Sequence, residues 1–128
     1  MIVVDVNVLA YLFIDGPQTP EVEALHELDP EWAAPLLWRS EWRSVLAGYL
    51  RRGELDRPTA IRMSEVAGRL LEGREYPVEH EAVLDIVLTS DLSAYDAEYV
   101  ATAKRLGLPL YTYNAGILGG FPTVARRP

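Results

Sequence analysis

The first nine residues constrain the fold of this chain most strongly. Residues 2–4 read Ile-Val-Val, an unbroken β-branched run that is typical of a strand buried on both faces of a parallel sheet. The run ends at Asp5, and an apolar helical pattern begins after Asn7. A carboxylate at such a junction lies at the carboxyl edge of the sheet, where open α/β folds bind their ligands. Helix capping by Asp5 or Asn7 is the alternative role.

Strands and helices are predicted to alternate along the rest of the chain. Further strands are predicted at residues 32–36, 76–78, 108–112 and 123–125. Helices are predicted at residues 8–14, 21–28, 37–52, 79–89 and 94–106, with another running from residue 56 to a stop at residue 73. This alternation predicts an α/β domain with three layers, α/β/α, around a central, mostly parallel sheet of four to five strands.

Length and composition narrow the class of protein. The chain has 128 residues, so we expect a single domain over residues 1–128. It has no cysteine, which excludes disulfides and thiolate metal sites. No apolar run approaches the roughly 20 residues that cross a bilayer, and no basic stretch precedes the first strand, so we expect a cytoplasmic protein without a membrane partner. A net charge of −7 argues against non-specific adhesion to nucleic acid but not against a nuclease, whose active site is itself acidic.

Three acidic residues occupy positions where a plain core pattern predicts an apolar side chain. Asp5 is the first. Glu41 lies in a helical stripe with Val45, and Asp96 lies in a stripe with Val100. If the three carboxylates meet at one sheet edge, they repel one another unless a divalent cation lies among them. Oxygen ligands without cysteine or histidine favour Mg²⁺ or Mn²⁺ over Zn²⁺.

Each acid also has a structural alternative. Asp96 would complete a capping arrangement with Ser93 and complement the helix dipole. Glu41 could reach solvent near its helix end. Asn114, just after the predicted strand 108–112, is either a side-chain amide ligand or water-positioning group, or a turn residue ahead of an Ala-Gly pair.

Two arginines are candidates for binding a substrate phosphate. Arg39 and Arg43 flank Glu41 in the sequence. Neighbours one or two positions away on a helix point to other faces, so we expect at most one of them to reach the substrate. A solvated face or a partner contact is the alternative for each. The tryptophans at 32, 38 and 42 lie in apolar segments, which favours core or dimer contacts over base stacking.

Four segments in order carry a resemblance to a known family. They read VVDVNVL at residues 3–9, LWRSEWRSVL at 37–46, LSAYDAEYVA at 92–101 and LPLYTYN at 108–114. Together they resemble the PIN domain and, within it, the VapC-type toxin nucleases. The resemblance implies a magnesium- or manganese-dependent endoribonuclease that acts on RNA as the toxin of a toxin–antitoxin pair. It also implies a homodimer silenced by a cognate antitoxin, with Asp5, Glu41 and Asp96 as catalytic metal ligands.

The chain departs from the family pattern at Asn114, where the family often has a fourth acid. Loss of a negative ligand should weaken or remove a second metal site. The alternative function is therefore a catalytically weak or inactive module that binds RNA or a protein partner. A receiver domain is disfavoured because the only lysine, Lys104, lies inside a predicted helix. A phosphatase-like site would require an aspartate where Asn7 stands.

Overall fold

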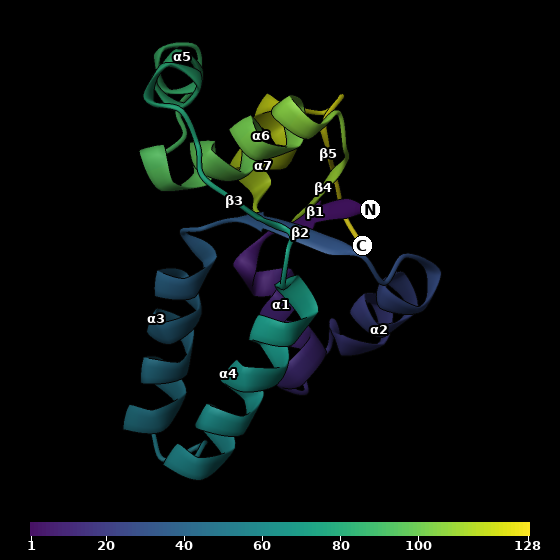
Figure 1. Cartoon of the computed structure of the whole chain (residues 1–128), viewed down its shortest axis with the longest axis vertical. Helices are drawn as coiled ribbons and strands as arrows, with labels where there is room; N and C mark the ends of the chain where they lie inside the picture. The colour runs from purple at the N-terminus through teal and green to yellow at the C-terminus, as the bar shows by residue number, and fades with distance from the viewer.

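A five-stranded, all-parallel sheet lies between two layers of helices in the computed structural model, which describes residues 1–128 (Figure 1). The strand order is β3-β2-β1-β4-β5. This confirms the predicted three-layer α/β fold. The strands are β1 (Ile2–Val4), β2 (Trp32–Pro35), β3 (Glu75–Tyr76), β4 (Leu110–Tyr111) and β5 (Ala125–Arg126).

The helices cover both faces of the sheet (Figure 1). One face carries α1 (Val6–Phe13), α2 (Thr19–Leu28), α3 (Trp38–Arg51) and α4 (Arg57–Leu71), and the other carries α5 (His80–Leu88), α6 (Ala94–Leu106) and α7 (Ala115–Gly120). The chain builds β1, β2 and β3 outward in one direction, then returns to add β4 on the other side of β1. The strand order therefore reverses between β1 and β4, which is where open α/β sheets form their ligand-binding crevice.

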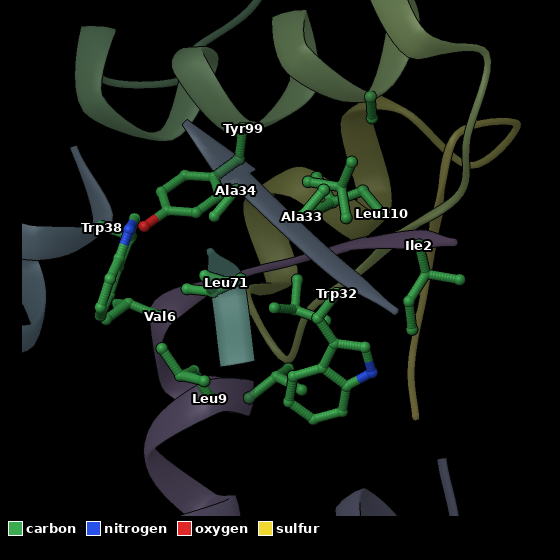
Figure 2. Packing of buried hydrophobic residues seen from close by; sticks show 14 of the residues in the cluster. Ile2, Val6, Leu9, Trp32, Ala33, Ala34, Trp38, Leu71, Tyr99 and Leu110 are labelled. Carbon is green, nitrogen blue, oxygen red and sulfur yellow. The ribbon is translucent and has the colours of Figure 1, made fainter. Parts of the chain in front are cut away.

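The β-branched first strand forms the centre of the sheet, as predicted. Its residues pair with β2 through Ile2 and Trp32, and with β4 through Val4 and Tyr111. All three residues of β1 are buried, within a core cluster of 27 residues. Figure 2 shows core side chains approaching the sheet from both layers, with Leu9 on α1 at one side and Tyr99 on α6 at the other.

The observed elements differ from the predicted ones mainly at their ends. Helix α1 begins at Val6 rather than residue 8, and the last three strands are only two residues long. Helix α7 was not predicted, because its sequence, Ala-Gly-Ile-Leu-Gly-Gly, is poor in helix formers. It forms because the side chain of Asn114 accepts a hydrogen bond from the Ile117 amide, and because Ile117 is fully buried.

The tryptophans at 32, 38 and 42 are at most 4% exposed, which confirms that they pack in the core. None of the seven helices combines the length and the hydropathy that a membrane crossing requires.

Candidate active site

Asp5 lies at the carboxyl end of β1, at the switch point between β1 and β4 where the strand order reverses. Its side chain contacts Thr112, the residue that follows β4. It occupies the N-cap position of α1 with an extended backbone, but its side chain makes no capping hydrogen bond. Instead, Asp5 Oδ2 accepts a hydrogen bond of 2.7 Å from Thr112 Oγ1. The residue is only 4% exposed, whereas Asn7 is exposed inside the helix. The backbone amides of Val6 and Asn7 lie near the Asp5 carboxylate and oppose the rise of its pKa that burial causes, but the one side-chain hydrogen bond of Asp5 joins it to Thr112 rather than to its own helix.

A chain of hydrogen bonds leads from Asp5 to Asp96. The Thr112 hydroxyl, which donates to Asp5, accepts a hydrogen bond of 3.0 Å from the backbone N–H of Asn114. The Asn114 side chain then donates from Nδ2 to Asp96 Oδ2 at 3.3 Å, while its Oδ1 accepts from the Ile117 amide. Asn114 thus caps α7 and contacts Asp96, so it combines a structural role with a place in the candidate site. Sequence reasoning missed Thr112, although a polar residue at the end of a buried strand is a usable signal.

Asp96 has the local structure that the sequence predicted. It lies in the first turn of α6, and the Ser93 side chain caps this helix by accepting a 3.1 Å bond from the Asp96 amide. The backbone of Asp96 therefore serves the cap, and its carboxylate is left to face Asn114 at the sheet edge. Asp96 thus takes part in the helix cap through its backbone N–H and in the candidate site through its carboxylate.

Glu41 reaches the same region from the opposite helical layer. It lies in the first turn of α3 and is half-buried. Tyr99, which is fully buried in α6, donates a hydrogen bond of 2.6 Å from its hydroxyl to Glu41 Oε1. Sequence reasoning also missed Tyr99. Its signal was a tyrosine in the apolar stripe of a helix, because a buried tyrosine hydroxyl needs a hydrogen-bond partner.

The charges of Asp5, Glu41 and Asp96 influence one another's ionisation. Burial raises the pKa of Asp5, and the charge of Asp96 raises it further, while the hydrogen bond from Thr112 opposes both. Burial likewise raises the pKa of Glu41, and the charges of Asp5 and Asp96 add to this effect. Three carboxylates that repel one another thus lie at one edge of the sheet.

The acids have no cationic partner within the protein. The three ion pairs of the chain join other groups: the N-terminus with Asp29, Arg39 with Glu75, and Arg52 with Glu54. A further acid, Glu98, is half-buried beside Glu41, and burial raises its pKa as well. Glu98 was not predicted as a site residue, because it lies off the apolar stripe of its helix.

As they stand, no three acidic or histidine side chains gather closely enough to hold one cation between them. The carboxylate oxygens are nevertheless the right chemical type for Mg²⁺ or Mn²⁺. Buried negative charges without a positive partner also favour a cation from solution. The chemistry of the donor set therefore fits a hard divalent cation.

The two arginines next to Glu41 have different environments. Arg39 binds Glu75 on β3 through Nε and a terminal nitrogen, both at 2.7 Å, and Glu75 also accepts from Trp38 Nε1. Its guanidinium is thus occupied by a carboxylate. Arg43 is exposed and has no carboxylate partner. Both arginines line a shallow pocket between α3 and α4.

Comparisons with known proteins place this geometry in a family. A search of curated proteins found no match. Among solved structures, the chain is similar to a toxin–antitoxin complex from Klebsiella pneumoniae, with 23% identity, a TM-score of 0.72 and coverage of 100% of this chain and 98% of that one. It is also similar to FitAcB from Neisseria gonorrhoeae, with 20% identity, a TM-score of 0.79 and the same coverage.

A third similar structure is PAE2754 from Pyrobaculum aerophilum, with 23% identity, a TM-score of 0.75 and coverage of 96% of this chain and 81% of that one. At these identities the likeness concerns the fold. The family model of the PIN domain matches residues 2–119, which include all of the candidate site. The chain therefore belongs to the PIN domain family.

Proposed function

We propose that this protein is a divalent-metal-dependent endoribonuclease and the toxin of a toxin–antitoxin pair. The observation that carries the proposal is the electrostatic repulsion among Asp5, Glu41 and Asp96, which have no cationic partner among the ion pairs of the protein. Membership of the PIN domain family supports a nuclease. The similar structure from Klebsiella pneumoniae is a toxin–antitoxin complex, which supports a cognate antitoxin as partner.

The cation, Mg²⁺ or Mn²⁺, would be held by Asp5, Asp96 and Glu41. When bound, it would polarise a phosphodiester group of RNA and acidify a water molecule for in-line attack. The protein contributes the orientation of the ligands. Thr112 orients Asp5 through one hydrogen bond, and Asn114 orients Asp96 through another. Because Asp5 is buried, its carboxylate is shielded from water, and its attraction for a cation is stronger than at an exposed position.

The experiment that tests the proposal measures metal binding and RNA cleavage together. Purified protein without its antitoxin is titrated with Mn²⁺ by calorimetry, then incubated with structured and unstructured RNA in Mn²⁺ or in EDTA. We expect Mn²⁺ binding and internal cleavage that stops in EDTA. Cleavage that continues unchanged in EDTA would falsify the metal-dependent mechanism.

A second function is favoured by one observation. Asn114 donates to Asp96, so one carboxylate oxygen is bound to an amide where a fourth acid would supply another metal ligand. A PIN module with such a site could bind RNA or a protein partner with little or no turnover. Mn²⁺ binding without cleavage of any RNA, in the experiment above, would favour this function. Assembly as a homodimer stays a prediction, which light scattering of the purified protein measures.

Replacing Arg43 by Ala is expected to weaken substrate binding. Its guanidinium is exposed, has no carboxylate partner, and can form charge-assisted hydrogen bonds with phosphate beside the pocket between α3 and α4. We expect KM for RNA to rise about threefold to tenfold with kcat nearly unchanged, because ground-state and transition-state binding are lost together. Initial rates over a range of RNA concentrations measure this.

The matched control for Arg43→Ala is Arg51→Ala, which removes an exposed arginine from the far end of the same helix. We expect its KM to equal that of the parent. A similar rise in KM for both variants would mean that RNA affinity depends on the total charge of α3 rather than on Arg43 itself. An unchanged KM in Arg43→Ala would remove Arg43 from the substrate site.

A further inference from the structure

A buried tyrosine connects two of the three acidic positions. The Tyr99 hydroxyl donates a 2.6 Å hydrogen bond to Glu41 Oε1, and no other side chain donates to this carboxylate. A buried hydroxyl without a partner is costly, and a carboxylate acceptor gives a charge-assisted bond that is shorter and stronger than a neutral one. The contact is therefore a defined interaction between α6 and α3 rather than a chance approach.

In this hydrogen bond the Tyr99 hydroxyl is the donor and the Glu41 carboxylate is the acceptor. A charged carboxylate is the form that binds a cation.

The position of Tyr99 on its helix links Glu41 to Asp96. Tyr99 follows Asp96 by three residues, so both side chains lie on one face of α6, about one turn apart. Figure 2 shows the Tyr99 ring extending from α6 toward Trp38, the first residue of α3. The bond to Glu41 therefore joins the helix that carries Asp96 to the helix that carries Glu41.

We propose that Tyr99 is a positioning residue, which holds the Glu41 carboxylate in one orientation and at a fixed separation from Asp96. The inference rests on the proposed metal-dependent function. Without this bond, a half-buried glutamate would sample several rotamers, and a bound cation would have to order it. Tyr99 touches neither the cation nor RNA in this scheme, so its effect on binding passes through Glu41.

The test begins with Tyr99→Phe, which keeps the ring and removes only the hydroxyl. We expect Mn²⁺ affinity, measured by calorimetry, to fall about tenfold, as is typical when a group that orients a metal ligand is removed. The control is Tyr95→Phe, which removes an exposed hydroxyl one turn earlier on the same helix. We expect its affinity to equal that of the parent, and circular dichroism should show all variants folded.

A double-mutant cycle with Glu41→Ala, which removes the acceptor of the Tyr99 hydrogen bond, separates positioning from packing. If Tyr99 acts through the Glu41 carboxylate, Tyr99→Phe lowers affinity about tenfold in the parent but less than about twofold beside Glu41→Ala. A packing role predicts the same loss in both backgrounds, and that result would overturn the proposal.

The outcomes distinguish this proposal from the proposed function. A parent protein that binds no Mn²⁺ overturns both of them. A parent that binds Mn²⁺, with Tyr99→Phe binding equally well, overturns only the role of Tyr99. A loss in Tyr99→Phe that is absent in Tyr95→Phe, and largely absent beside Glu41→Ala, supports the role of Tyr99.

Discussion

Asp5→Asn is expected to lower the rate of Mn²⁺-dependent RNA cleavage by at least about 10²- to 10³-fold, the range found when a preorganised electrostatic group is removed. Asparagine has nearly the same shape and can still accept the hydrogen bond that Thr112 donates to Asp5. What it lacks is the negative charge at the buried end of β1. The loss should therefore appear in the rate at saturating RNA as well as in Mn²⁺ affinity. Initial rates of cleavage of an end-labelled RNA measure it.

The same substitution is expected to raise stability, which separates lost activity from lost folding. Burial raises the pKa of Asp5 above its ordinary value of 3.8, so the folded protein holds this proton more tightly than the unfolded chain does. The parent protein therefore loses stability as the pH rises from about 3.8 through the raised pKa. The Asp5→Asn variant does not lose this stability, because asparagine does not ionise. In EDTA at pH 7 we expect it to be about 0.5–2 kcal/mol more stable, with the gain shrinking at low pH.

Asp15→Asn is the matched control for Asp5→Asn. It removes the same charge from an exposed loop position, and we expect parental activity and a stability within about 0.5 kcal/mol of the parent. Denaturant unfolding in EDTA and the cleavage assay are applied to both variants. Full activity in Asp5→Asn would show that the acidic cluster does not perform the reaction. A strong loss of stability would show that its charge is structural.

The placement of Asp5 and Asn114 at one edge of the sheet could be predicted because it follows from topology. A β-branched run predicts a central strand, and the carboxyl ends of parallel strands share one edge of the sheet. Asp5 at the end of β1 and Asn114 after β4 therefore had to lie near each other. The Ser93 cap placed Asp96 at the start of a helix with equal clarity. These inferences need only local patterns and one rule of sheet topology.

The hydrogen-bond partners could not be predicted in the same way. Thr112 is separated from Asp5 by 107 residues, and Tyr99 is separated from Glu41 by 58. No periodicity links positions so far apart, since their contact depends on how the layers pack. Such residues also resemble ordinary core residues in the sequence, because both are fully buried.

The arginines illustrate the same limit. Arg39 and Arg43 looked equivalent, since each lies two residues from Glu41. The difference between them comes from Glu75 on β3, which lies 36 residues from Arg39 in sequence and binds it through two nitrogens. The residue that decides which arginine is free belongs to a strand whose register the sequence could not define.

Asn114→Asp is expected to tighten Mn²⁺ binding by about 10- to 100-fold, because the number of charged ligands tunes the affinity of oxygen sites strongly. The aspartate would retain the cap of α7, since its Oδ1 can still accept from the Ile117 amide. Its other oxygen, however, would replace the Nδ2 donor that lies 3.3 Å from Asp96 Oδ2. An attractive contact thus becomes a repulsion between carboxylates, which only a cation between them relieves.

The two consequences of Asn114→Asp have opposite signs, and this makes the prediction specific. In EDTA we expect the variant to be about 1–2 kcal/mol less stable than the parent, because a hydrogen bond is replaced by two facing acceptors. In saturating Mn²⁺ the order should reverse, since ligand binding stabilises the folded state in proportion to the logarithm of affinity. Gln18→Glu adds the same charge outside the site, at the N-cap of α2, and should respond to Mn²⁺ as the parent does. If Asn114→Asp is destabilised equally in EDTA and in Mn²⁺, Asn114 does not face the cation, and its amide serves only to join α7 to α6.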